Sequence, residues 1–347
     1  MIFAVMSMLT VLASQWQSAP AVDPVTPGYG AGVSAMYAGS IAGVPIIAGG
    51  ANFPDIPVWE GGKKAFYSDI YMNDNGEWRY VAALPEPLAY GMTAQAGDDR
   101  LVFIGGCGYN GAIGQVTALE RDESGAWRQT AFPSLPTALQ EGAAATSGHV
   151  IYVAGGVAGG NPSSSLMALD TENLNKGWYE LASMPEPLVQ PVMVSSGGRL
   201  YLWGGCNPAA GTVSGRGYVY DPQTDAWTEI AGHPVDGTFT GAAAVALPDG
   251  RILCLGGVDR KVFTPALKYT GAEIREYQTR PVEAYRFQRV SWIYDPANDK
   301  WESHGEDQCV ARAGASAVGV ADGIWLIGGE LKPGVRTPHP VFRPFQK

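Results

Sequence analysis

The chain has 347 residues, a net charge of −10 and only 16% charged residues. The acidic balance argues against a nucleic acid as partner, although a local basic site can still bind an anionic small molecule. The 46 glycines fit short strands and tight turns better than disorder.

The first segment, residues 2–13, is an apolar run that is too short for a transmembrane helix. It ends in small residues and resembles the hydrophobic part of a secretory signal, although no basic leader precedes it. We therefore expect residues 1–13 to be a signal segment and the protein to be periplasmic or otherwise exported. The alternative is that the run forms a strand, in which case the protein would be cytoplasmic.

The rest of the chain repeats itself with a period of about 50 residues, which indicates a repeat architecture. Each repeat has a Gly-Gly pair that closes a short apolar run. The pairs begin at Gly49, Gly105, Gly155, Gly204, Gly256 and Gly328. A second series consists of tryptophans between successive pairs: Trp78, Trp127, Trp178, Trp227 and Trp301.

Each repeat predicts four strands and no long helix. A small-residue strand such as residues 142–146 precedes a tight turn and an apolar strand that runs into the Gly-Gly pair. A third strand ends in Tyr-Asp-Pro, as at residues 220–222, and a turn leads to the fourth strand with its tryptophan. Sheets stacked around an axis converge, so only small side chains fit the inner strands, and tryptophan fills the wider outer gaps.

These features resemble the kelch repeat and predict an all-β protein, a six-bladed β-propeller with four-stranded antiparallel blades. The sixth repeat has no downstream tryptophan, whereas Trp16 stands alone near the N-terminus. We therefore expect the N-terminal strand around Trp16 to pair near Val341 and Phe342, closing the ring and removing exposed sheet edges. Residues 14–347 are then a single domain.

The cysteines and histidines do not indicate a metal site. Cys107, Cys206, Cys254 and Cys309 have no zinc-type spacing, and the first two follow Gly-Gly pairs at equivalent positions. A copper radical oxidase is one alternative on this fold, but it needs histidines and tyrosines that converge on one metal. The available histidines are His149, His233, His304 and His339. We expect no cofactor.

Candidate functional residues lie on the loops after the second strands and on the segments leading into the first strands, which meet at one face. The loops supply Asn52, Phe53, Asn110, Asn207, Asp259, Arg260, Glu330, Lys332 and Arg336. The segments leading into first strands supply Tyr90, Gln140, Glu141, Gln190 and Arg312. Of these we expect Arg336, Asn52, Tyr90, Gln190, Asn207 and Arg312 to bind substrate.

The most unusual stretch is residues 329–337, which read Gly-Glu-Leu-Lys-Pro-Gly-Val-Arg-Thr. The Pro-Gly turn folds the chain back and brings Arg336 near Glu330. An arginine suits a substrate carboxylate, because its planar fork pairs with both oxygens, and a glutamate can move a proton to and from a sugar hydroxyl. The alternative is a structural ion pair that braces the loop.

This stretch resembles the pattern Gly-Glu-x-Lys-Pro-Gly-x-Arg-Thr of the bacterial N-acetylneuraminate epimerases, or sialic acid mutarotases, which are six-bladed kelch proteins. Residues 28–32, 46–51 and 63–70 are also similar to that family. The order of the motifs implies a circularly permuted member, because the glutamate-bearing blade is last here. The resemblance implies that Glu330 is catalytic and that Arg336 binds substrate, whereas residues 262–289 are only loosely similar.

The family implies mutarotation of N-acetylneuraminic acid or a related acidic sugar by ring opening and closure, with one glutamate moving both protons, directly or through water. The expected partner is therefore a small acidic sugar, with no nucleic acid and no membrane span. The alternative is a kelch propeller that binds a protein or a glycan without catalysis, because a fold alone does not decide function.

Overall fold

Apolar runs rich in β-branched and aromatic residues alternate with glycine-containing turns, and each run forms a strand. The computed structural model describes residues 16–122 and 124–345; the predicted signal segment, residues 1–13, lies outside them. The described residues are mostly strands and form antiparallel sheets of four main strands, as the sequence predicted. No described helix is long and apolar enough to cross a membrane.

The main sheets follow one another along the chain, each running from an inner to an outer strand. The first two sheets are β2 (Tyr37–Ile41), β3 (Val44–Ala48), β6 (Asp69–Asp74) and β7 (Glu77–Ala83), then β8 (Met92–Gln95), β9 (Arg100–Ile104), β12 (Val116–Arg121) and β13 (Trp127–Phe132). The next two are β15 (Ala143–Ser147), β16 (Val150–Ala154), β19 (Leu166–Asp170) and β20 (Tyr179–Leu181), then β21 (Val189–Ser196), β22 (Arg199–Asn207), β24 (Gly217–Asp221) and β25 (Ala226–Ile230).

The last two main sheets include the strand nearest the N-terminus. They are β26 (Ala243–Ala246), β27 (Ile252–Leu255), β28 (Val290–Asp295) and β29 (Lys300–Glu306), then β30 (Ser316–Val320), β31 (Gly323–Ile327), β34 (Val341–Pro344) and β1 (Gln17–Ser18). In the last sheet Gln17 lies opposite Phe342 and Ser18 opposite Val341. Strands from the two ends of the described chain thus share one sheet.

Short ribbons and helical turns connect these sheets. The ribbons are β4 (Ala51–Asn52) with β5 (Ala65–Phe66), β10 (Cys107–Gly108) with β11 (Gly111–Ala112), β14 (Leu139–Gln140) with β17 (Val157–Ala158) and β18 (Asn161–Pro162), β23 (Thr212–Val213) on β22, and β32 (Glu330–Lys332) with β33 (Val335–Arg336). The 3-10 turns are η1 (Tyr29–Ala31), η2 (Val58–Glu60), η3 (Leu174–Lys176), η4 (Val282–Tyr285) and η5 (Gln308–Val310).

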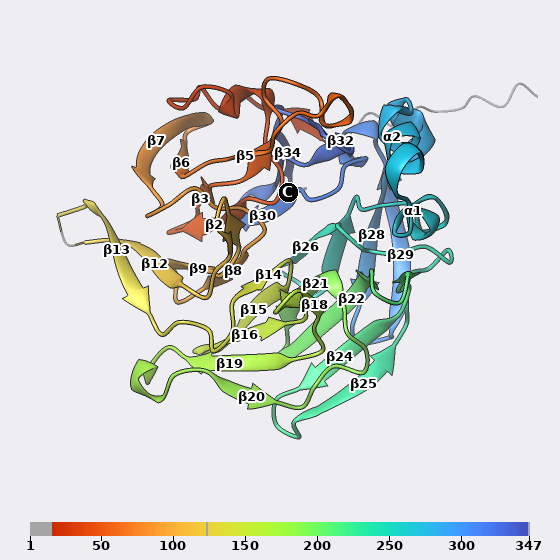
Figure 1. The fold of residues 1–347 in the computed structure, drawn as a ribbon. Coiled ribbons are helices and arrows are strands. Elements are labelled where there is room, and N and C mark those ends of the chain that lie inside the picture. The colour runs from red at the N-terminus through yellow and green to blue at the C-terminus, as the bar shows by residue number, and fades with distance from the viewer. Residues whose placement is uncertain (1–15, 123, 346–347) are drawn as a thin grey trace, which may run out of the picture.

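The sheets are arranged around a common centre, with β2, β8, β15, β21, β26 and β30 innermost (Figure 1). Each of these inner strands contacts the inner strand of the following sheet, and β30 contacts β2. Apolar clusters fill the gaps between neighbouring sheets. Trp178 packs against the sheet that precedes its own, Trp227 does the same, and Trp16 packs with Leu253 and Val341. The predicted space-filling role of the tryptophans is confirmed for these positions.

Six residues at or just before the start of the inner strands join in a closed circle of backbone hydrogen bonds, which we call the central ring. Each residue donates its N–H to the carbonyl of the preceding one at 2.7–3.2 Å, in the order Ala35, Tyr90, Glu141, Gln190, Gly241 and Gly314, and Ala35 donates to Gly314. All six have a left-handed backbone, with φ between 56° and 65°. The central ring sets the face on which the candidate residues gather.

Two short helices, α1 (Arg260–Ala266) and α2 (Gly271–Thr279), occupy the first part of the segment of residues 262–289, and α1 begins two residues before it. The sequence analysis did not predict them, because they are too short to show helical periodicity. The Asp259 carboxylate caps α1 by accepting a hydrogen bond from the Val262 N–H at 2.9 Å. The helices stand beside β28 and β32 in Figure 1, and η4 after them contacts β32.

Candidate active site

The hairpin of β32 and β33 carries Glu330 and Arg336, and the Gly-Gly pair before it fixes its position. The Gly329 N–H donates to the Val33 carbonyl at 3.0 Å. A Cβ atom on Gly328 would lie 2.4 Å from the same carbonyl oxygen, and both glycines have positive φ. Glu330 then exchanges two backbone hydrogen bonds with Ala313, at 2.7 and 3.0 Å. The backbone of Glu330 is therefore anchored beside the central ring.

Glu330 and Arg336 lie close together, as the Pro-Gly turn predicted, and they form the ion pair that the sequence analysis gave as the alternative to substrate binding by Arg336. The distance from Nη2 of Arg336 to Oε1 of Glu330 is 2.6 Å. The Arg336 side chain is only 2% exposed, whereas that of Glu330 is 27% exposed. The guanidinium thus lies behind the carboxylate, and Glu330 is the member of the pair that reaches open space.

The remaining contacts of Arg336 hold it in place. Its Nε donates to Oγ of Ser34 at 3.0 Å and to the Ala51 carbonyl at 3.3 Å. The guanidinium also lies over the ring of Phe53, 5.4 Å from the centroid. Nη1 is buried and has no hydrogen-bond partner among the described residues. In this arrangement Arg336 positions Glu330 and has little access to a ligand of its own.

Burial raises the pKa of Glu330, because the charged form loses hydration, while the nearby cations Arg336 and Lys64 act in the opposite direction. A carboxyl group whose pKa is raised is better matched to proton transfer near neutral pH than an ordinary one. The environment of Glu330 therefore suits a general base or acid.

Glu330 lines a cavity of about 390 Å³ above the central ring. Tyr90 and Gln190, two predicted substrate-binding residues, line the same cavity, and so does Glu141. The other side is aromatic, with Phe263, Tyr277 and Phe287 from the segment that carries α1 and α2. The volume is in the range of small-molecule sites, and a mainly apolar wall with few polar groups is typical of them.

Lys64 belongs to this site, and the sequence analysis did not select it. Its Nζ donates to the Tyr90 hydroxyl at 2.7 Å and lies 4.5 Å from the centroid of that ring. The Lys64 side chain is half-buried and forms no ion pair among the described residues. A half-buried cation without a carboxylate partner favours an anionic ligand. Its position in the family-like stretch of residues 63–70 was the only sequence signal.

Asn52 lies apart from the cavity and is fully engaged within the protein. Its Nδ2 donates to the carbonyls of Gly28 and Gly32 at 2.9 and 2.8 Å, and its Oδ1 accepts from the Tyr67 hydroxyl at 2.8 Å. The residue is 2% exposed. Asn52 therefore braces the loop beneath Arg336, and its predicted contact with substrate stays a prediction.

Arg312 and Asn207 also have internal partners rather than places in the cavity wall. Arg312 donates to the carbonyls of Cys309, Gly328 and His339 at 2.7–3.2 Å, and burial lowers its pKa to about 10. Oδ1 of Asn207 accepts the Ala210 N–H at 3.0 Å and stabilises a turn. Their predicted substrate contacts likewise stay predictions.

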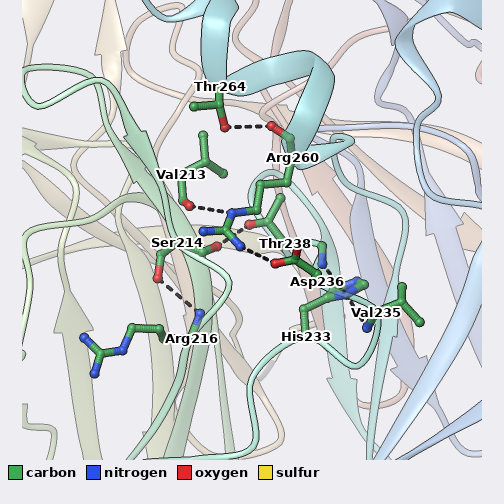
Figure 2. A network of polar contacts seen from close by, with 10 residues as sticks. Val213, Ser214, Arg216, His233, Val235, Asp236, Thr238, Arg260 and Thr264 are labelled. Atoms are coloured by element: carbon green, nitrogen blue, oxygen red, sulfur yellow. Dashed lines mark hydrogen bonds and ion pairs between the residues drawn. The ribbon is translucent and has the colours of Figure 1, made fainter.

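A second cavity, of about 480 Å³, lies on the other side of Phe287 and is rich in charges that neutralise one another. Figure 2 shows Arg260 between the Val213 carbonyl and Asp236, to which it donates at 3.0 and 2.8 Å. Nδ1 of His233 accepts two backbone N–H groups there, and burial lowers the His233 pKa to about 4. The histidine is thus neutral.

The four cysteines are free, and no group of three or more His, Cys, Asp or Glu side chains within residues 16–122 and 124–345 is arranged to hold a metal ion. The titratable groups that line the cavity at Glu330 are instead those of acid–base chemistry, two carboxyl groups and two phenols, with the Lys64 ammonium group beside them on Tyr90. Such a set can bind a polar ligand and move protons on it.

A family model described as N-acetylneuraminate epimerase matches residues 5–126 and 132–346. The chain is 31% identical over 247 residues to a protein of that name from Brucella melitensis biotype 1, with 66% of this chain and 62% of the relative covered. It is 33% identical over 222 residues to one from Yersinia enterocolitica serotype O:8, with 59% and 55% covered. The chain therefore spans less than two thirds of the length of these relatives.

Proposed function

Because this chain belongs to the N-acetylneuraminate epimerase family, we propose that it is an isomerase that interconverts the α and β anomers of N-acetylneuraminic acid or a related acidic sugar. The observation that carries the proposal is the placement of Glu330. Its carboxylate faces a ligand-sized cavity and is held from behind by the buried guanidinium of Arg336.

Mutarotation requires only proton transfers and rotation about one bond. A base removes the proton of the anomeric hydroxyl, the bond from the anomeric carbon to the ring oxygen breaks, and the ring oxygen gains a proton. The ring opens to a ketone, and the former ring oxygen becomes a hydroxyl group. After rotation the ketone turns its other face to that hydroxyl group, and the steps run in reverse. In the proposal Glu330 takes the proton of the anomeric hydroxyl and returns it on closure.

The positive charge near Glu330 has two proposed roles. Arg336 orients the Glu330 carboxylate and opposes its protonation, which burial favours. Lys64 meets the substrate carboxylate, because it is half-buried beside the cavity and, among the described residues, its ammonium group donates only to Tyr90. A direct contact between Arg336 and the substrate, as the family resemblance implies, stays a prediction because the side chain is only 2% exposed.

The test is anomer exchange of N-acetylneuraminate, measured by saturation-transfer NMR with wild-type protein and Glu330→Gln. We expect wild type to accelerate exchange and the variant to lose about a hundredfold or more in kcat, as is typical when general acid–base catalysis is removed. Glu120→Gln is the matched control, because Glu120 also forms an ion pair with an arginine, at 2.7 Å, but lies outside the cavity.

A folded Glu330→Gln variant with the wild-type rate would remove Glu330 from the mechanism. Binding of the sugar without any exchange by wild type would favour the alternative, a kelch propeller that binds a glycan without catalysis. Wild type exchanges the anomers in the first outcome and does not in the second. A titration of the sugar with wild-type protein therefore separates the two.

For the architecture we propose a six-bladed kelch-type β-propeller of one domain, residues 14–347, closed by the N-terminal strand. The backbone ring of six residues supports this proposal, and so does the pairing of Gln17 with Phe342. Circular permutation relative to the family and export of the protein stay predictions.

A further inference from the structure

The central ring forces an unusual backbone on every residue in it, and the chain meets this demand in two different ways. Gly241 and Gly314 adopt positive φ without strain. Tyr90, Glu141 and Gln190 adopt it at φ 57–61°, where a side chain is disfavoured and glycine is the preferred residue. Ala35 adopts the same conformation at φ 56°. Strain of this kind in polar residues that face a cavity is common at functional sites.

The three polar residues among them, Tyr90, Glu141 and Gln190, are consecutive in the central ring and form what we call the polar arc. All of them line the cavity that Glu330 lines. The other half of the ring is small, with Ala35, Gly241 and Gly314. The cavity thus has polar side chains along one half of its base and open space along the other.

Glu141 is the middle residue of the polar arc and lies opposite Glu330. Glu141 is three positions from Gly314 in either direction around the six-membered ring. Glu330 is hydrogen-bonded through its backbone to Ala313, the neighbour of Gly314. The backbones of the two glutamates therefore lie on opposite sides of the ring, and both residues line the same cavity of about 390 Å³.

The surroundings of the two glutamates differ in charge. Glu330 is ion-paired with Arg336, which favours the carboxylate form. Glu141 forms no ion pair among the described residues, and its carboxylate accepts a hydrogen bond from the neutral amide of Gln190, at 3.1 Å. Burial raises the pKa of Glu141, although Lys64 and that amide oppose the effect. Unlike environments of this kind separate an acid from a base.

We propose that Glu141 is the second catalytic residue of this site and acts as the acid where Glu330 acts as the base. The proposal rests on the function proposed above. On ring opening Glu330 takes the anomeric hydroxyl proton, the carbon–oxygen bond breaks toward the ring oxygen, and that oxygen takes the proton of Glu141. On closure the hydroxyl returns its proton to Glu141, and Glu330 gives its proton to the carbonyl oxygen.

Other titratable groups near Glu141 do not replace it as this acid. The thiols of Cys107 and Cys206 both have a raised pKa, mainly through burial, and the Glu141 charge adds to the effect; that of Cys206 rises to about 12. Burial raises the pKa of the Tyr90 phenol, whose oxygen accepts the hydrogen bond from Lys64. Lys64, Tyr90 and the cavity-lining Tyr277 are all kept when Glu141 is substituted. A pH effect specific to Glu141 can therefore be read from a single substitution.

Two substitutions test the proposal through the pH profile of kcat for anomer exchange. Glu141→Gln keeps the shape of the side chain, and we expect kcat to fall about a hundredfold with loss of the alkaline limb. Glu141→Gly also removes the strained side chain, and we expect the same loss of kcat together with an unchanged or higher melting temperature. A merely structural Glu141 would instead lower the melting temperature in at least one variant.

Asn75→Gly is the matched control for relief of strain, because Asn75 has φ 53° in a turn outside the cavity. We expect it to keep the wild-type kcat. The proposal is overturned if Glu141→Gln keeps the wild-type kcat and both limbs, or if only KM changes. Absence of exchange by wild type would overturn the proposed function together with the role of Glu141. Exchange by wild type and by Glu141→Gln at equal rates would overturn only the role of Glu141.

Discussion

Replacement of Arg336 by methionine separates its role behind Glu330 from a role in substrate binding. The substitution keeps much of the volume and removes the guanidinium that lies 2.6 Å from the carboxylate. It also removes two hydrogen bonds, to Ser34 and to the Ala51 carbonyl. Breaking a buried ion pair costs about 3–5 kcal/mol, and we expect about 3 kcal/mol here, because Glu330 is 27% exposed and regains some hydration.

The loss in the free energy of unfolding caused by Arg336→Met should depend on pH in a defined direction. The folded-state pKa of Glu330 is already raised by burial, so the folded protein binds a proton more tightly than the unfolded chain. That contribution to stability is present below the unfolded pKa of about 4.3 and is lost as the pH rises through the folded pKa. Without Arg336 the folded pKa moves higher, so the cost of Arg336→Met should be largest at pH 7–8 and shrink toward pH 4.

Urea unfolding between pH 4 and 8 measures the cost, and the exchange assay over the same range measures the ionisation of Glu330. In Arg336→Met we expect the acid limb of the kcat profile to move to higher pH. In a Glu330→Gln background we expect the same substitution to lower the free energy of unfolding by less, and by an amount that does not depend on pH. Arg312→Met is the control, because Arg312 is equally buried but donates only to backbone carbonyls. An unchanged acid limb with a raised KM for the acidic sugar would refute this reasoning and support direct binding.

Three further predictions concern Lys64, Asn52 and the N-terminal strand. Lys64→Met should raise KM for N-acetylneuraminate by at least about tenfold and leave a neutral sugar almost unaffected, since a hydrogen bond to a charged group is lost; equal effects on both sugars would argue against the role. Asn52→Ala should lower the free energy of unfolding by about 1–3 kcal/mol, because two buried carbonyls lose their donor; unchanged urea unfolding with a raised KM would restore a binding role. Deletion through Ser18 should expose the edge of β34 and cause aggregation in gel filtration, whereas a monodisperse product would contradict the assigned edge.

The sequence predicted the strands because their causes are local and repeated. The turn and strand residues recur in each repeat, and the Gly-Gly pairs could be recognised as special positions. What the sequence did not reveal is why they are special. In five of the six pairs the first glycine approaches a carbonyl of the segment that leads into the following sheet, as Gly49 approaches that of Leu88, and the second glycine donates to it. That contact joins residues about 40 positions apart and has no local signature.

The site residues were harder to predict than the fold, because position on a loop does not decide what a polar side chain contacts. Asn52 and Glu330 both follow a Gly-Gly pair directly or nearly so. Asn52 turns to three internal partners, whereas Glu330 reaches the cavity. Lys64 was overlooked for the converse reason, since a lysine before a two-residue strand looks like an ordinary surface residue until Tyr90 is placed beside it.

The central ring explains how strained residues can be tolerated at the site. Three polar residues in a left-handed conformation cost about 1–2 kcal/mol each relative to an ordinary backbone. The hydrogen bond that each N–H makes to the carbonyl of the preceding ring residue fixes this conformation, and a change at one position would break two bonds of a closed circle. The same circle holds Glu141 rigidly, which acid–base catalysis requires because proton transfer depends on hydrogen-bond geometry. Stability and catalysis therefore make opposite demands at this position: glycine would relieve the strain at Glu141, and only a carboxyl group can supply the proton.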